Sequence, residues 1–164
     1  MSKKNKKSGE SPATNKGQRP IAENRKARHR FQVLESLECG VALVGSEVKS
    51  LRNGKLSLDE AYGRVRNGEV WLVGCDIAEY PNAAMMNHDR LRPRKLLLHK
   101  REIAKFAAKA YETGLTLVPL KMYFKDGKAK LLLGIGRGRK MHDKREKLKK
   151  ETVKRDLQRM MRGK

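Results

Sequence analysis

The middle of the chain alternates apolar and polar positions with the two-residue period of β-strands. Phe31, Val33 and Leu37 share one parity, and a short apolar run follows at 41–44, after Gly40. Alternate side chains of a strand lie on one face, so this pattern predicts two successive short strands with a buried face.

The dipeptide Asn67-Gly68 predicts a hairpin turn. It separates stretches of strand-like composition at 60–66 and 69–75. Both central positions of a type I′ turn need a positive φ, which Asn, Asp and Gly adopt most readily. We therefore expect these two stretches to pair as antiparallel strands.

Asp126-Gly127 predicts a second hairpin by the same reasoning. Residues 118–124 alternate before it, and an apolar run follows at 131–135. Pro119 has no N–H to donate, so the strand that contains it is expected to run along a sheet edge or to carry a bulge.

Two stretches show helical spacing instead. Apolar residues recur at three-, four- and seven-residue intervals from 96 to 111, and Gly114 follows as a C-cap. This apolar stripe consists of Leu96, Ile103, Phe106, Ala107, Ala110 and Tyr111. A shorter helix is expected over 47–53, capped by Ser46 and ended by Gly54.

Together these elements predict a mainly β fold. Five or six short strands around one core, with a helix at one end, are typical of a small OB-like closed β-barrel with peripheral α-helices. We expect this barrel to span residues 24–137. Residues 1–23 contain almost nothing apolar, so they cannot offset the entropy of ordering and are expected to form a disordered basic arm.

Residues 138–164 are expected to form a basic C-terminal tail. Val153, Leu157, Met160 and Met161 make a narrow apolar stripe at helical spacing. Such a stripe does not stabilise an isolated helix, so we expect the tail to be disordered in the free protein and helical in an RNA-lined groove. A helix docked on its own barrel is the alternative.

The charge indicates the class of partner. The 164 residues include 40 Lys or Arg and 18 Asp or Glu, which gives a net charge of +22. Polyphosphate matches such a density, so nucleic acid is expected ahead of other partners. Three clusters could track phosphates if the fold brings them together, and the alternative is a set of solvated surface charges. The clusters are Arg28, His29 and Arg30; Arg90, Arg92, Arg94 and Lys95; and Arg137, Arg139 and Lys140.

The aromatic residues bear on the kind of nucleic acid. Phe31, Trp71 and Phe106 lie on apolar faces, where core packing accounts for them. Single-strand binders typically expose aromatic rings for stacking. The sequence therefore favours folded RNA, recognised through backbone and shape, over a naked strand, and no DNA partner is expected.

No constellation of catalytic groups is evident. The histidines His29, His88, His99 and His142 lack metal-ligand spacing and are each expected at the surface or facing RNA. We therefore expect neither an enzyme nor a metal or other cofactor. Two other functions stay open at this point, namely a general structural or ribosomal RNA-binding protein and, less favoured, a small RNA-acting enzyme.

The cysteines and the hydropathy indicate the compartment. Cys39 and Cys75 are too few for a disulfide framework, so we expect reduced thiols in a cytoplasmic protein. No window approaches the roughly 18 apolar residues of a membrane span, and the basic N-terminus has no apolar segment behind it. No membrane partner is expected.

Four motifs follow one another along the chain: NRKARH at 24–29, GSEVKSLR at 45–52, RKLLLHKREI at 94–103 and HDKR at 142–145. In this order and spacing they resemble the SmpB family of bacterial proteins, which bind transfer-messenger RNA (tmRNA, or SsrA RNA). The resemblance covers roughly residues 23–162 and implies an OB-like tmRNA-binding barrel. It also implies trans-translation, in which alanyl-tmRNA carried by elongation factor Tu enters a stalled ribosome and encodes a tag for proteolysis.

The resemblance further implies two sets of site residues. The tmRNA-binding set is Arg28, His29, Glu38, Gly40, Arg94, Lys95, Leu97, His99 and Gly138, with His99 where the family often has Asn. The set that contacts the stalled 70S ribosome is His142, Asp143, Lys144, Arg145, Val153, Met160 and Met161. This second set would place the tail in the decoding centre and the empty mRNA channel.

Overall fold

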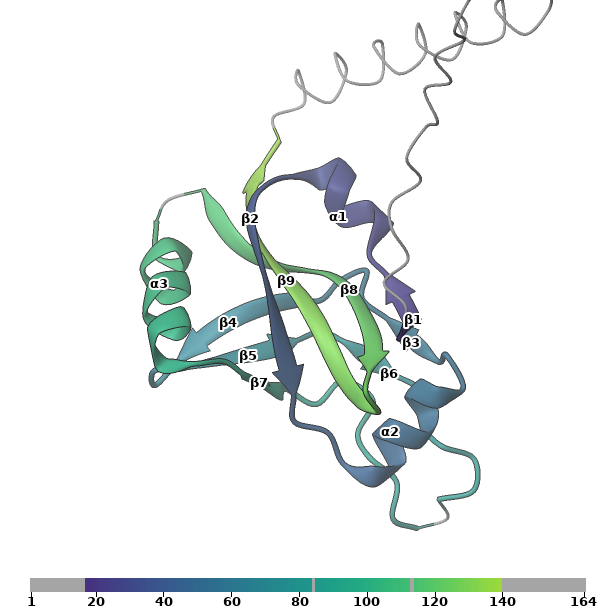
Figure 1. The fold of residues 1–164 in the computed structure, drawn as a ribbon. Coiled ribbons are helices and arrows are strands. Elements are labelled where there is room, and N and C mark those ends of the chain that lie inside the picture. Colours follow the sequence, from purple (N-terminus) through teal and green to yellow (C-terminus); the bar gives the residue numbers. More distant parts are fainter. Residues whose placement is uncertain (1–16, 84, 113, 140–164) are drawn as a thin grey trace, which may run out of the picture.

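The computed structural model describes residues 17–83, 85–112 and 114–139 (Figure 1). Strands predominate, and three helices lie at the periphery of the described part. In chain order the elements are β1 (Gln18–Glu23), α1 (Arg25–Arg30), β2 (Phe31–Val41), α2 (Gly45–Arg52), β3 (Leu56–Ser57), β4 (Tyr62–Arg66), β5 (Glu69–Val73), β6 (Asp76–Ile77), β7 (Arg94–Leu97), α3 (Lys100–Ala110), β8 (Leu115–Lys125) and β9 (Lys128–Gly138).

The main sheet closes into a barrel. Its strand order is β1-β8-β4-β5-β7-β2-β9, and β8 also pairs with β9, so the strands from β8 to β9 form a ring. Every neighbouring pair is antiparallel. Closure leaves few free sheet edges, which is how small all-β domains avoid edge-to-edge association. The predicted closed barrel with peripheral helices is therefore confirmed.

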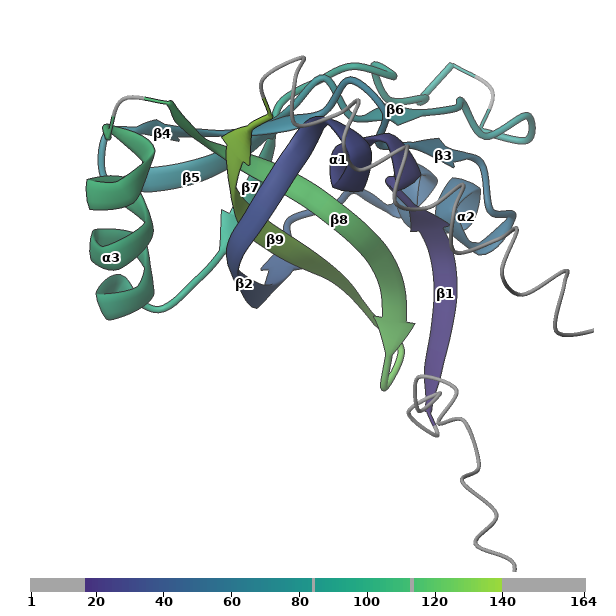
Figure 2. The same cartoon turned by 90° about the horizontal axis from the view of Figure 1, so that it is seen from above.

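The barrel interior is the hydrophobic core. Val70 and Leu72 on β5, like Leu131 and Leu133 on β9, are 0% exposed because they occupy the inward positions of their strands. Helix α3 covers one end of the ring, where Phe106 is buried among these side chains (Figure 2). One end of the barrel is thus plugged by a helix, as the sequence predicted.

Both hairpin predictions are confirmed. Asn67 and Gly68 have φ values of 52° and 70°, and Asp126 and Gly127 have values of 51° and 73°. These positive angles are those of type I′ turns, whose twist matches that of the flanking strands. The turns join β4 to β5 and β8 to β9, with strand ends within three residues of those predicted.

Strand β2 is longer than predicted. Two short strands on either side of Gly40 were expected, but one strand of 11 residues runs through it. Gly40 pairs with Leu97, and a Cβ atom at Gly40 would lie 3.2 Å from the Leu97 Cβ. The glycine therefore permits a close side-chain approach across the sheet and does not interrupt the strand.

Of the two alternatives for Pro119, the bulge is observed. The register between β8 and β9 shifts between Pro119 and Lys121. Strand β8 has neighbours on both sides along most of its length, so it is not an edge strand. The bulge accommodates the missing donor.

Both predicted helices form, with different N-termini. Helix α3 begins at Lys100, because Leu96 belongs to β7, where it faces the core opposite Val70. Its first turn is capped by Glu102, whose carboxylate accepts a 2.8 Å hydrogen bond from the His99 N–H. The predicted helix start at residue 96 was wrong. Leu96 fits the apolar spacing of the helix, but it is an inward-facing residue of strand β7.

Helix α2 begins at Gly45, and Ser46 is not its cap. The Glu47 carboxylate accepts a 2.9 Å hydrogen bond from the Val44 N–H and so satisfies the start of the helix. The Ser46 hydroxyl instead lies 3.0 Å from Nδ1 of His88.

The last residues of the expected disordered arm are ordered, which corrects the boundary predicted at residue 23. Residues 18–23 form β1, which pairs with β8 (Figure 2). Ile21 and Ala22 supply apolar contacts to the core, and these contacts offset the entropy of ordering the strand. Residues 1–16 lie outside the described part. No helix of the described residues is long and apolar enough to cross a bilayer.

Candidate nucleic-acid interface

Pairing of β2 with β7 brings two distant parts of the sequence together. Gly40 lies opposite Leu97 and Val41 opposite Leu96. Beside this pairing is an outward-facing groove of about 700 Å³. Five of the predicted tmRNA-binding residues line it, namely Glu38, Gly40, Lys95, Leu97 and His99.

Leu97 forms the apolar part of this groove. Its side chain is 53% exposed, and its Cδ1 atom lies 3.4 Å from where a Gly40 Cβ would be. The absence of a side chain at Gly40 thus lets Leu97 lie flat against β2. The groove combines this apolar surface with amines of Lys95 and Lys130 and the exposed imidazole of His99.

Glu38 is held in a fixed orientation beside the groove. The Tyr123 hydroxyl donates a hydrogen bond to one carboxylate oxygen, and the Lys125 Nζ lies 3.2 Å from the other. The hydrogen bond from Tyr123, together with Lys125, keeps the pKa of Glu38 below its ordinary value. Burial and this carboxylate raise the pKa of Tyr123. An ionised carboxylate is a hydrogen-bond acceptor only, so it suits a ribose hydroxyl or a base amino group.

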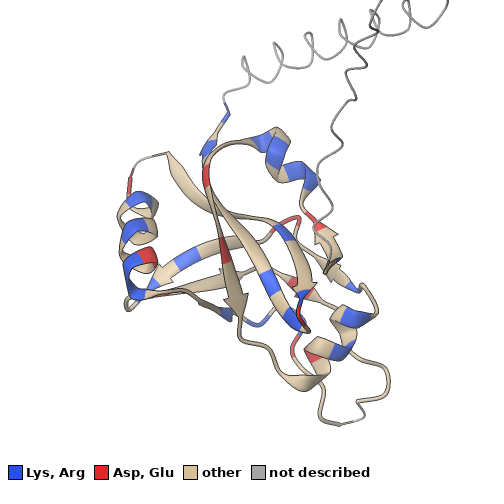
Figure 3. Cartoon of the chain, viewed as in Figure 1, with Lys and Arg blue, Asp and Glu red and all other residues tan. Residues whose placement is uncertain are grey.

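A second group of predicted residues lies at the other end of β2. Gly138 pairs with Phe31, the first residue of this strand. Helix α1 directly precedes β2 and exposes Arg28 and His29. Asn24 anchors this helix, because its side chain accepts a hydrogen bond from the Ala27 N–H and donates one to the Leu58 carbonyl. Figure 3 shows the Lys and Arg positions of α1 beside the end of β9.

The two groups are separated along the strand. From Phe31 to Gly40 the strand advances roughly 30 Å, at about 3.3 Å per residue. The predicted site is therefore two contact areas on one barrel, with the groove at one end of β2 and the α1 surface at the other.

Arg94 does not belong to this surface, which corrects the sequence prediction. Its side chain is 0% exposed and forms a 2.8 Å ion pair with Glu47, which is equally buried. The guanidinium also donates to the backbone carbonyls of Cys75 and Arg90, at 2.7 and 3.1 Å. The motif does not show that the carboxylate partner in α2 is buried, so the sequence alone does not distinguish this structural arginine from an RNA contact.

The other basic residues of that cluster are also neutralised. Arg90 forms a bidentate pair with Asp76, and Lys95 pairs with Glu69. Arg92 donates to both carboxylate oxygens of Glu47 at 2.7 Å. Of the predicted phosphate-tracking cluster, Arg94 is buried, and Arg90 and Arg92 do not line the groove. Lys95 borders the groove, and because its pair with Glu69 is partly exposed, its amine stays within reach of a phosphate.

Two further predictions change. His88 is 7% exposed and contacts Ser46 and the Ile77 carbonyl, so it is a buried structural residue. Trp71, expected in the core, is only partly buried and lines a pocket outside the barrel. His29 and His99 are exposed as predicted.

Two residues beside the groove, Tyr123 and Lys130, were not predicted from the sequence. Lys130 lies opposite Gly40 on β9, and Tyr123 lies opposite Lys130 on β8, where its hydroxyl reaches Glu38. The hairpin at Asp126-Gly127 fixes their register and could have identified them. Within the described ranges, no group of His, Cys, Asp or Glu could hold a metal ion. The predicted tail residues His142, Asp143, Lys144, Arg145, Val153, Met160 and Met161 lie outside the described residues.

A closed barrel with an exposed groove and a separate cationic end is the architecture of a β-barrel RNA-binding protein. A family model described as SmpB protein matches residues 21–163. The chain belongs to the SmpB family, which is a family of RNA-binding proteins and not of enzymes.

Individual relatives agree with this assignment. An SsrA-binding protein of Rhodopirellula baltica is 61% identical over 146 residues, covering 88% of this chain and 83% of its own length. One from Staphylococcus carnosus is 48% identical over 161 residues, covering 98% of this chain and 97% of its own. A solved structure described as "tmRNA-SmpB: a journey to the center of the bacterial ribosome" matches with a TM-score of 0.64 at 49% identity, covering 74% of this chain and 86% of that one.

Proposed function

We propose that this protein binds the tRNA-like domain of tmRNA and delivers it to stalled ribosomes for trans-translation. The observation that carries the proposal is the β2–β7 pairing, which gathers Glu38, Gly40, Lys95, Leu97 and His99 into one groove. The names of the relatives and the tmRNA-SmpB structure support it. The protein works in the cytoplasm, where stalled ribosomes are found.

The groove suits a folded RNA better than a free strand. Amines at Lys95 and Lys130 bind phosphates, the Glu38 carboxylate accepts from a ribose hydroxyl or a base amine, and Leu97 packs on a sugar or base. The α1 surface, roughly 30 Å away along β2, binds backbone further along the same molecule. Arg28, His29 and Gly138 lie in this second area.

In this proposal the C-terminal tail binds the ribosome. It occupies the decoding centre and the mRNA channel, which is empty downstream of a truncated message. Elongation factor Tu takes part through its hold on the alanyl end of tmRNA. The residues of the tail in this role are His142, Asp143, Lys144, Arg145, Val153, Met160 and Met161.

The first experiment captures the tagged full-length protein from its own bacterial lysate at physiological salt and sequences the bound RNA. Strong enrichment of one tmRNA over tRNA is the expected result. RNA recovered in proportion to its abundance would instead indicate a general RNA-binding protein and overturn the proposal. Cleavage of labelled RNA in Mg²⁺ would indicate an enzyme.

A matched pair of variants tests the groove directly. Leu97 and Leu91 are both exposed leucines, at 53% and 57%, but Leu97 lines the groove and Leu91 lies in the loop before β7. Leu97→Ala is expected to weaken binding of the tRNA-like domain about tenfold, or about 1.4 kcal/mol. Leu91→Ala is expected to bind normally. Equal affinities of the two variants would show that the groove is not the interface.

A further inference from the structure

The outer face of the β4–β5 hairpin carries the single tryptophan of the chain. Trp71 lies between Val70 and Leu72, which are both 0% exposed inside the barrel, so its indole lies on the outer face. It pairs in register with Arg64 on β4 and with Lys95 on β7. The three side chains form one row across three neighbouring strands.

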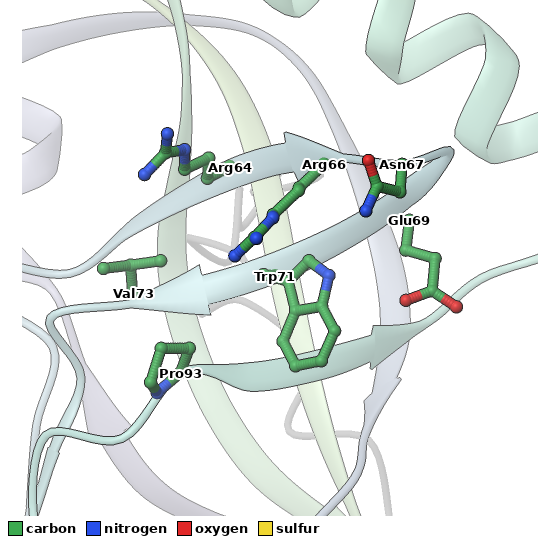
Figure 4. Close-up of a pocket in the computed structure, with 7 residues that line it drawn as sticks. All are labelled: Arg64, Arg66, Asn67, Glu69, Trp71, Val73 and Pro93. Carbon is green, nitrogen blue, oxygen red and sulfur yellow. The ribbon is translucent and has the colours of Figure 1, made fainter.

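A pocket of about 420 Å³ lies over this row. Figure 4 shows the Trp71 ring directed toward β7, with Val73 and Pro93 to one side of it. The Arg66 side chain extends from β4 over the hairpin toward the indole, and Arg64 projects from the same strand. The Trp71 ring, its apolar wall and the Arg66 guanidinium thus face solvent together, and Arg64 lies at the rim of the pocket.

The two arginines of this pocket differ from Arg90 and Arg92 in their surroundings. Within 17–83, 85–112 and 114–139, no carboxylate lies within 4.0 Å of either guanidinium. Arg90 and Arg92, by contrast, are held by Asp76 and Glu47. Glu69 also lines the pocket, but its carboxylate pairs with Lys95.

We propose that this pocket holds one unpaired RNA nucleotide, with its base stacked on the Trp71 indole and the flanking phosphates on Arg64 and Arg66. Stacking on an aromatic ring beside cationic groups is the usual way in which proteins hold unpaired bases, and it accepts any base. A peptide segment would have to bring carboxylates to the arginines and is the less suitable occupant. The identification of the RNA as tmRNA rests on the proposed function, whereas the pocket itself is testable without it.

The pocket adjoins the groove on β2 and β7. Glu69 lines both, and Lys95 stands between Trp71 and the groove. Trp71 lies on the strand next to β7, opposite Lys95, and Leu97 lies two residues further along β7, which gives a separation of roughly 8 Å. An RNA whose folded part lies in the groove therefore reaches the indole with its next unpaired nucleotide.

Intrinsic fluorescence tests the proposal, because all tryptophan emission of the full-length protein comes from Trp71. A labelled five-nucleotide oligoadenylate is the probe. Its anisotropy reports binding, and the Trp71 emission is expected to change along the same saturation curve. Binding of the probe without a change in Trp71 emission would overturn the proposal. So would a control without RNA in which the Trp71 emission changes in the same way when only the protein concentration is varied.

Variants separate stacking from charge. Trp71→Ala is expected to weaken oligoadenylate binding about tenfold, and Trp71→Phe to stay within about threefold of the wild type, since it keeps a ring. The double variant Arg64→Gln/Arg66→Gln is expected to reduce the slope of log K against log salt by about 1.4, or about 0.7 for each lost phosphate contact. Circular dichroism checks that each variant is folded.

The control removes the same charge elsewhere. Arg52→Gln/Lys55→Gln changes two exposed residues at the end of α2, away from the hairpin (Figure 1). If both double variants lose the same affinity, the pocket has no special role and the proposal fails. A normal Trp71 response without preference for tmRNA would reject the proposed function alone, and a tmRNA preference without that response would reject the pocket alone.

Discussion

Glu47 and Arg94 form an ion pair of 2.8 Å in which both side chains are 0% exposed. Arg92 and the Val44 N–H also donate to the same carboxylate. Burial alone would raise the pKa of Glu47, but these donors outweigh it and lower the pKa. The pair joins α2 to the strand that ends at Leu97, so it supports the groove from behind.

Removal of one partner from this pair is expected to destabilise the fold. Glu47→Ala leaves a buried guanidinium without its counter-charge, which costs about 3–5 kcal/mol of unfolding free energy. Urea denaturation measures the loss. The exposed pair of Arg90 with Asp76 is the control, and Asp76→Ala is expected to cost less than about 1 kcal/mol. Similar losses for both variants would contradict the assignment.

Gly40 is expected to matter for binding more than for stability. A side chain there meets Leu97, which must move away from β2. Gly40→Val should therefore weaken binding of the tRNA-like domain about tenfold while the barrel stays folded. In a double-mutant cycle, adding Gly40→Val to Leu97→Ala should cost little more, because both act through one contact. Additive losses would show that Gly40 acts separately.

Acid should remove the stabilisation that comes from Glu38. Its folded pKa lies below the ordinary value of 4.5, chiefly because Tyr123 donates to it. A carboxyl with a lowered pKa stabilises the folded state at pH values above the ordinary pKa, and this contribution is lost as the pH falls through the folded pKa. Glu38→Gln should therefore be less stable than the wild type at pH 7, with a difference that shrinks toward pH 3. Urea midpoints at both pH values measure it, and a constant difference would contradict the assignment.

The two thiols should be unreactive in the folded protein. Burial raises the pKa of Cys39 to about 12 and that of Cys75 to about 11. The thiolate is the reactive species, so a disulfide reagent at pH 8 should label neither side chain until urea unfolds the barrel. Rapid labelling of either cysteine in native buffer, read by mass spectrometry, would contradict this.

Removal of the tail should separate binding from tagging. A chain that ends at Lys140 keeps the groove and α1, so its affinity for tmRNA should stay within about twofold of the full chain. Tagging of a nascent chain on ribosomes stalled without a stop codon should be abolished. Filter binding and a translation assay give the two values, and equal loss of both activities would refute the division of labour.

Features that depend on residues close together in the sequence could be predicted, and features that depend on distant residues could not. Asn67-Gly68 fixes its turn through its own backbone angles, so the hairpin could be predicted locally. Arg94 could not be placed, because its partner Glu47 is 47 positions away and both had to be known to be buried. The motifs indicated which residues belong to the family pattern but not which of them face outward. Trp71 was assigned to the core because its apolar neighbours hide the alternation that directs it outside.

The double pairing of β9 also has a consequence for biosynthesis. Apart from Gly40 and Val41, which contact β7, the length of β2 pairs only with β9 among the described strands. In a nascent chain that ends before residue 138, β2 therefore lacks its partner β9, and β8 lacks one of its neighbouring strands. Contacts of such long sequence separation form slowly, and unpaired strands with an apolar face are prone to association. The barrel can close only after β9 has left the exit tunnel, so we expect chains cut short before that point to stay unfolded and open to proteases and chaperones.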